Sequence, residues 1–172
     1  MPFKNIIRSS RWTALVFSVA VLWPASELVA AEFTHGDYQV SVNLSEQSVL
    51  SDSDYQIVVS SNDLVLSRLS ARSAGSLDQA FVSDLNRDGG FEVVVTFLPA
   101  DQGAADLHIY SWRNNLLEAQ AVMTSEDGHQ AGTAVTGAFA IDNGLLVRND
   151  AAAGKRVVYT FKDGTWVSAS GQ

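Results

Sequence analysis

A short run of oxygen-bearing side chains, closed by two glycines, is the first feature whose residue types and spacing could do chemistry. Asp84, Asn86 and Asp88 alternate along the chain, and Glu92 follows two residues after Gly90. Alternating carboxylate and amide oxygens beside a glycine turn are what a hard cation such as Ca²⁺ requires. The pattern predicts a calcium loop whose ligands are the side chains of Asp84, Asn86, Asp88 and Glu92 and the carbonyl of Gly90.

The same residues allow a second interpretation, in which no metal is bound. Asp and Asn side chains in a tight turn accept hydrogen bonds from the backbone amides of that turn. Arg87 lies inside the loop, and Asn86 contributes no negative charge. An EF-hand is excluded, because the twelfth position counted from Asp84 is Val95 rather than a glutamate. The sequence leaves the calcium loop and the self-capped turn as alternatives.

Residues suited to catalysis do not gather in a recognised pattern. The three histidines, His35, His108 and His129, share no metal-ligand spacing, and the chain has no cysteine. Neither a Gly-x-Ser-x-Gly nucleophile elbow nor a phosphate-binding glycine loop is present. We therefore expect that the protein is not an enzyme, and that Ca²⁺ is the one cofactor to consider.

The elements that must position these residues have the patterns of short β-strands. Tyr38 to Leu44 alternates apolar and polar residues, and Glu92 to Leu98 is almost continuously apolar, as in a strand buried on both faces. Small polar residues at 70–76 predict a loop. Tight hairpin turns are predicted at Asn114-Asn115, Asn143-Gly144 and Asp163-Gly164. The predicted fold class is all-β, an antiparallel β-sandwich of about 8–10 short strands linked by hairpins.

The N-terminal segment has the composition of a secretory signal peptide. Basic residues precede an apolar run from Thr13 to Trp23, and small residues follow up to Ala31. A proline and a glutamate interrupt the run before it reaches the length of a membrane span. We expect residues 1–31 to be cleaved, leaving residues 32–172 as a single β-sandwich domain, periplasmic or secreted. The mature chain is expected to begin with a loose segment at 32–37.

The composition narrows the class of partner. The 172 residues include 19 acidic and 11 basic side chains, for a formal net charge of −8. An acidic surface disfavours nucleic acid and anionic membranes, and it favours a basic partner or a cation. We therefore expect no nucleic-acid partner, and no membrane partner after signal cleavage.

Residues 81–110 carry a resemblance to a known family. The run FVSDLNRDG at 81–89, followed by Glu92 to Val95 and then by Leu107 to Tyr110, resembles the periplasmic inhibitors of I-type (invertebrate) lysozyme. Members of that family have a similar V-x-D-L-D-x-D-G-x-P-E-L-V-V core strand and a loop that returns as L-x-V-Y. The closing hairpins also look similar, so the resemblance spans roughly Tyr55 to Val167.

The resemblance implies a secreted β-sandwich, often homodimeric, that blocks a lysozyme cleft with an exposed loop. In the family this loop carries a Ser-Gly-x-x-Tyr-Gly motif, and here Asp101 stands at the serine and Ala104 at the tyrosine. We expect a lysozyme-inhibitor-like protein whose partner is a lysozyme, of the I-type by the resemblance. The partner-binding loop would consist of Pro99, Ala100, Asp101, Gln102, Gly103, Ala104, Ala105 and Asp106.

A function of a different class stays open beside this one. The chain could be a calcium-stabilised secreted β-module with a structural or adhesive role and no inhibitory activity. In that case the acidic run at 84–92 would bind metal, and Ca²⁺ would raise the melting temperature because it binds only the folded state.

Overall fold

The computed structural model describes residues 28–45, 52–98, 105–124, 138–150 and 154–171. These ranges contain thirteen β-strands and no helix. Among them there is accordingly no helix long and apolar enough to cross a membrane.

The strands form three sheets, which we name N-terminal, middle and C-terminal. The N-terminal sheet contains β1 (Leu28–His35), β2 (Tyr38–Leu44), β3 (Asp52–Ser61) and β4 (Leu64–Ala74), in that order. The middle sheet contains β5 (Ser76–Ser83), β6 (Phe91–Leu98), β7 (Asp106–Arg113) and β8 (Leu116–Gln120). The C-terminal sheet has the order β10 (Ala138–Asp142), β11 (Leu145–Asp150), β12 (Lys155–Lys162), β13 (Thr165–Gly171) and β9 (Val122–Thr124).

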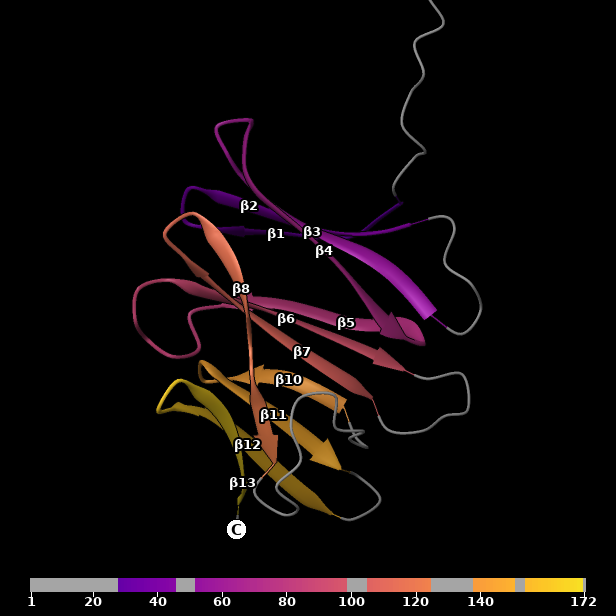
Figure 1. Cartoon of the computed structure of the whole chain (residues 1–172). Helices are drawn as coiled ribbons and strands as arrows, with labels where there is room; N and C mark the ends of the chain where they lie inside the picture. Colours follow the sequence, from indigo (N-terminus) through magenta and orange to yellow (C-terminus); the bar gives the residue numbers. More distant parts are fainter. Residues whose placement is uncertain (1–27, 46–51, 99–104, 125–137, 151–153, 172) are drawn as a thin grey trace, which may run out of the picture.

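The three sheets are stacked in layers, with the middle sheet between the other two (Figure 1). Neighbouring strands are antiparallel except for β9, which pairs in parallel with β13. The prediction of an all-β, antiparallel, hairpin-linked fold is confirmed. The described strands are more numerous than the predicted 8–10, and they make three layers rather than the two of a simple sandwich.

The third layer follows from the apolar character of β6, whose residues from Phe91 to Phe97 are all buried. Val93 and Val95 point into a core shared with the N-terminal sheet. Val94, between them, points into a second core shared with the C-terminal sheet. Because successive side chains of a strand face opposite ways, the apolar run Val93 to Val95 needs a sheet on each side.

The predicted two-residue turns form as expected. Asn114, Asn115, Asn143 and Asp163 have φ between 50° and 61°, and Gly144 and Gly164 are also at positive φ. Asn, Asp and Gly tolerate this left-handed region, which the turns of two-residue hairpins require.

Two local predictions were wrong. The segment at 32–37, predicted to be loose, instead belongs to β1 as far as His35, because Phe33 packs on the first core and strand pairing with β2 follows. Residues 70–74, predicted as loop, extend β4, because β3 is long enough to pair with all of them. Strand β1 begins at Leu28, upstream of the predicted cleavage point; residues 1–27 lie outside the described ranges.

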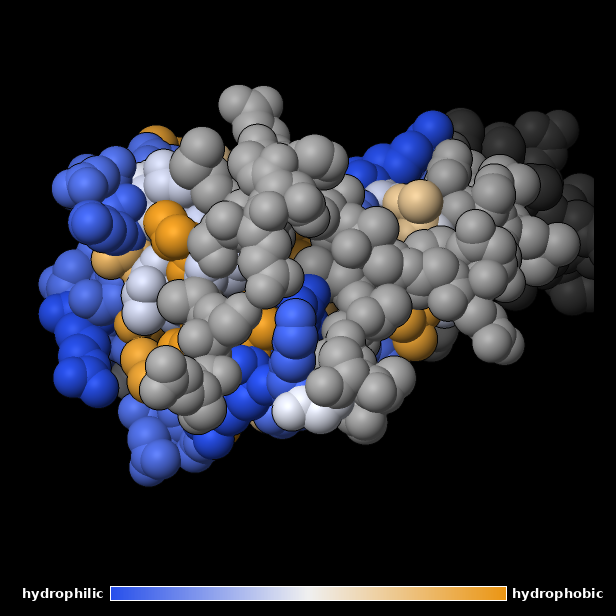
Figure 2. Space-filling model, turned by 90° about the horizontal axis from the view of Figure 1, so that it is seen from below, coloured by the Kyte–Doolittle hydropathy of each residue, from blue (hydrophilic) through white to orange (hydrophobic). Residues whose placement is uncertain are grey.

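The outward faces of the two outer sheets carry polar pairs. On the N-terminal sheet Arg72 forms an ion pair with Asp54. On the C-terminal sheet Arg156 of β12 pairs with Asp142 of β10, so the pair crosses β11 above Val147, which is 1% exposed. Seen from this side, hydrophilic residues dominate the end with the tight turns, and hydrophobic ones show only in small patches between them (Figure 2).

Candidate functional site

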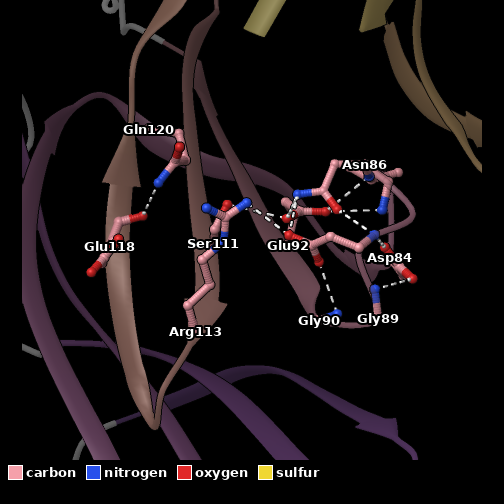
Figure 3. Close-up of polar contacts among 11 residues, drawn as sticks. Asp84, Asn86, Gly89, Gly90, Glu92, Ser111, Arg113, Glu118 and Gln120 are labelled. Atoms are coloured by element: carbon pink, nitrogen blue, oxygen red, sulfur yellow. Dashed lines mark hydrogen bonds and ion pairs between the residues drawn. The ribbon is translucent and has the colours of Figure 1, made fainter. Parts of the chain in front are cut away.

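The acidic run forms the connection between β5 and β6, the first hairpin of the middle sheet. The first hairpins of the other two sheets, β1–β2 and β10–β11, have two-residue turns instead. Ser83 pairs with Glu92, so the loop takes up the residues between them. Asp84, Asn86, Gly90 and Glu92 converge on one side of the middle sheet (Figure 3). The structure therefore brings together the residues that the sequence predicts as one site.

The side chains of the loop cap its own backbone. The two carboxylate oxygens of Asp84 accept hydrogen bonds from the amides of Asp88 and Gly89, both at 3.2 Å. Asn86 Oδ1 accepts from the Asp88 amide at 2.9 Å, and Asp88 Oδ1 accepts from the Gly90 amide at 2.9 Å. These bonds are those of the self-capped turn.

The orientation of the Asn86 amide is decided by its neighbours. Because the Asp88 N–H is a donor, the Asn86 atom that faces it must be the oxygen. The Asn86 Nδ2 group consequently donates to Asp88 Oδ2 at 3.1 Å and to Glu92 Oε1 at 2.9 Å. An N–H group, rather than a lone pair, thus lies between the two carboxylates.

Glu92 is a carboxylate in the interior, with 1% of its surface exposed. Its Oε2 accepts from the amides of Leu85 at 2.9 Å and Asn86 at 3.3 Å. Its Oε1 accepts from Asn86 Nδ2 and from the Ser111 hydroxyl, the latter at 3.1 Å. Burial raises the pKa of the Glu92 carboxyl, and these hydrogen bonds oppose part of the rise.

Arg113 joins the loop to the neighbouring layer. Its Nη2 donates to Asp88 Oδ2 at 2.7 Å, while its guanidinium carbon lies 5.8 Å from the centre of the Phe161 ring of β12. The pKa of Asp88 is lowered by the Gly90 amide first and by Arg113 next. Arg113 therefore links the acidic loop to the C-terminal sheet.

This arrangement does not present an open cation site. Every carboxylate oxygen of Asp84, Asp88 and Glu92 already accepts a hydrogen bond from the loop or from Ser111 or Arg113. No group of three or more His, Asp or Glu side chains placed to hold a metal occurs in the described part of the chain. The geometry is that of the self-capped alternative; calcium binding by Asp84, Asn86, Asp88, Gly90 and Glu92 stays a prediction.

Most of the predicted partner-binding loop lies outside the described residues. Pro99, Ala100, Asp101, Gln102, Gly103 and Ala104 fall in the undescribed range. The two that are described belong to the body of the protein: Ala105 is buried in the second core, and Asp106 is the first residue of β7.

Asp106 is held by residues of two sheets. Its Oδ2 accepts from the Ser73 hydroxyl of β4 at 2.7 Å and lies 2.9 Å from His108 Nε2. These bonds lower the pKa of Asp106, the His108 contact being the larger cause. The His108 ring stacks on Tyr110, whose hydroxyl is 2.5 Å from that of Tyr55, and burial raises the pKa of both tyrosines.

Ser73, His108 and Asp106 include the residue types of a hydrolytic triad, but their geometry differs from one. In a triad the aspartate holds one ring nitrogen of the histidine and the serine uses the other. Here Asp106 Oδ2 and Ser73 Oγ both contact Nε2 of His108, and Ser73 donates its proton to Asp106. Ser73 is also buried, so the arrangement serves to join β4 to β7.

Sequence reasoning missed this cluster. Asp106 and His108 stand two residues apart and so share a strand face, which is a signal present in the sequence. Ser73 gave none, because it lies in the stretch predicted as loop. Of the other histidines, His35 packs against Phe91 with ring centres 5.2 Å apart, and His129 lies outside the described residues.

Comparisons with protein-family models, with curated proteins and with solved structures find no match to this chain. Its function is therefore inferred from its own residues.

Proposed function

We propose that this protein is a periplasmic or secreted inhibitor of a lysozyme, and that the segment 99–106 contacts the enzyme. The resemblance of residues 81–110 to the inhibitors of I-type lysozyme supports the proposal. The net charge of −8 also supports it, since an acidic surface speeds encounter with a basic enzyme. The signal-like N-terminus would bring the protein to the compartment where such enzymes act.

The structural observation that best supports this proposal is that Asp106, at the end of the segment, is held in place by hydrogen bonds. The segment leaves from the end of β6, the most buried strand, and returns where Ser73 and His108 hold Asp106. Fixed ends reduce the conformational entropy that a binding segment loses on complex formation. Leu98, the last residue of β6, is 41% exposed. It would offer the enzyme an apolar contact next to the segment.

A non-catalytic role is part of the proposal. The trio of Ser73, Asp106 and His108 lacks the relay geometry of a hydrolase, and its serine is shielded from substrate. A homodimer, which the resemblance implies, belongs to the same proposal and is tested by sedimentation of the purified mature protein.

A secreted β-module with a structural or adhesive role is the second candidate. The acidic loop favours it, because that loop ties two layers together through Arg113 and ends in a carboxylate with four donors. Under this candidate the protein inhibits no lysozyme, and its stability is the property that responds to changes in the loop.

The test is inhibition of invertebrate-, chicken- and goose-type lysozymes by residues 32–172. We expect inhibition of at least one class, with the largest effect on the invertebrate type. Asp101→Arg reverses the charge within the segment and is expected to weaken inhibition at least about 10-fold, roughly 1.4 kcal/mol. Asp37→Arg, which makes the same change in the exposed β1–β2 turn, serves as the control.

Either of two results would contradict the proposal. Lack of inhibition of all three enzymes would reject the inhibitor function and leave the structural module. Inhibition that Asp101→Arg and Asp37→Arg alter equally would retain the function but reject the segment 99–106 as the contact.

A further inference from the structure

Two polar groups on the inner face of the C-terminal sheet lack hydrogen-bond partners. The Nε of Arg148 on β11 and the hydroxyl of Tyr159 on β12 are buried, and no acceptor or donor reaches either of them in the described structure. Tyr159 is 1% exposed, whereas Arg148 is half-buried and so reaches solvent. A buried N–H or O–H without a partner lowers the stability of the folded state by about 1–3 kcal/mol. Two such groups side by side therefore need an explanation.

The register places these two groups side by side. Leu146 pairs with Tyr159, and Arg148 pairs with Val157, so Arg148 and Tyr159 are diagonal neighbours on adjacent strands. Both face inward, because Leu146 and Val157, which alternate with outward residues on the same strands, are members of the second core. The positive charge of Arg148 also opposes the rise that burial causes in the pKa of Tyr159.

Arg148 forms no ion pair among the described residues. The buried members of the second core are apolar residues, with Tyr159 and Trp166 as the two that carry a polar atom. Trp166, on the adjacent strand β13, adds a third buried donor without an acceptor. By contrast, Arg72, Arg113 and Arg156 each form an ion pair.

We propose that Arg148 and Tyr159 form a binding site for a small oxyanion, a carboxylate or phosphate group, that enters between the middle and C-terminal sheets. Guanidinium and phenol groups donate to such oxygens, and a charged hydrogen bond in a dry setting is stronger than one in water. The positive charge of the Arg148 guanidinium, which can only donate, selects an anion over a cation. This site lies apart from both the acidic loop and Asp106, and it does not depend on the inhibitor function.

Thermal unfolding at constant ionic strength tests the site, with sodium acetate or sodium phosphate replacing sodium chloride. Binding to the folded state alone raises the melting temperature. We expect acetate or phosphate at 100-fold its dissociation constant to raise it by about 9 °C, which follows from about 2.7 kcal/mol of binding. Acetate represents carboxylates and phosphate the phosphoryl group, so the two arms identify the source of the oxyanion.

Three variants decide whether the shift comes from this pair. Arg148→Met is expected to abolish the anion-dependent shift, and Tyr159→Phe, which removes one hydroxyl and no volume of note, to halve it. Arg156→Met is the matched control, since it removes the same charge from the other face of the same sheet. It is expected to keep the full shift.

Two outcomes would overturn the proposal. One is the absence of any anion-dependent shift in the wild-type protein, which would mean that water hydrates both donors. The other is a shift that persists in both Arg148→Met and Tyr159→Phe. If Arg148→Met does not fold, saturation-transfer NMR of the acetate methyl group with Tyr159→Phe and the wild type gives the same decision.

Discussion

Two buried polar groups, the Glu92 carboxylate and the Nε of Arg148, differ in how many hydrogen-bond partners they have. Glu92 lies on the face of the middle sheet that looks toward the C-terminal sheet, and four donors engage its two oxygens. Arg148 lies on the inner face of the C-terminal sheet, and no acceptor for its buried Nε occurs within the described ranges. Asp106 is intermediate, with two partners on Oδ2 and, among the residues that the structure describes, none on its buried Oδ1.

The number of hydrogen-bond partners distinguishes a group that stabilises the fold, Glu92, from a group that we propose binds a ligand, Arg148. A buried charge with all its hydrogen bonds made is costly to alter, because any substitution leaves donors unpaired. A buried polar group with no partner costs stability as it stands, and its removal relieves that cost. The two residues should therefore respond to substitution in opposite directions.

Glu92→Gln is expected to have the largest effect of the changes considered. The amide preserves the shape of the side chain but places an NH₂ group against two donors, whichever way it is turned. We expect a loss of about 3 kcal/mol in the free energy of unfolding by urea. Glu118→Gln, on the neighbouring exposed position of β8, is the control and should change stability by less than about 0.5 kcal/mol. Equal effects of the two would contradict the role given to Glu92.

Arg113→Met and Arg148→Met compare a partnered with an unpartnered arginine. Arg113 loses its contacts with Asp88 and Phe161, both near solvent, so we expect a loss of about 1 kcal/mol that shrinks at high salt. Arg148→Met, measured in chloride without added oxyanion, is expected to leave stability unchanged or to raise it. Urea unfolding measures both, and a large loss for Arg148→Met would indicate an unrecognised partner.

Asp106→Asn tests the intermediate case through pH. Because the pKa of Asp106 is lowered in the folded state, its contribution to stability is complete above the ordinary aspartate pKa. That contribution is lost as the pH falls from the ordinary value through the lowered folded-state pKa. We expect the variant to be less stable by about 1 kcal/mol at pH 7, with the gap closing toward pH 2. Asp63→Asn, in the exposed β3–β4 turn, is the control. A gap that does not vary with pH would exclude the ionised carboxylate as the cause.

Calcium is expected to have the smallest effect. Since the oxygens of the acidic loop already accept hydrogen bonds, a cation would have to displace Asn86 Nδ2 and Arg113 Nη2 to bind. We expect the melting temperature to change by less than about 1 °C between millimolar Ca²⁺ and chelator. A larger rise that disappears in Asp88→Ala would restore the calcium loop.

What could be predicted from the sequence is local. The turns at Asn114-Asn115 and Asn143-Gly144 depend on which residues tolerate positive φ, and the acidic loop depends on oxygens a few residues apart. The burial of β6 on both faces could also be predicted, because the strand is almost continuously apolar. These features need no knowledge of distant neighbours.

What could not be predicted depends on which strands meet. Alternation along a strand says that one face is buried but does not say against which sheet, so three layers could not be told from two. The small polar end of β4 is held by pairing with β3, and this pairing brings Ser73 to Asp106. A buried group without a hydrogen-bond partner, such as Arg148 Nε, cannot be predicted from the sequence, because it depends on which atoms surround it in the folded structure.

The single parallel pairing has a consequence for the order in which the molecule is assembled. Most strands pair with the next strand along the chain, and such hairpins close quickly. Val122 of β9, however, pairs with Trp166 of β13, and about forty residues separate them. A chain that emerges from its N-terminus can complete two sheets early, but the third waits for its last strand. Until then Val122 lacks its strand partner, and a chain that ends before Thr165 also lacks Trp166, so the C-terminal sheet covers the middle sheet incompletely.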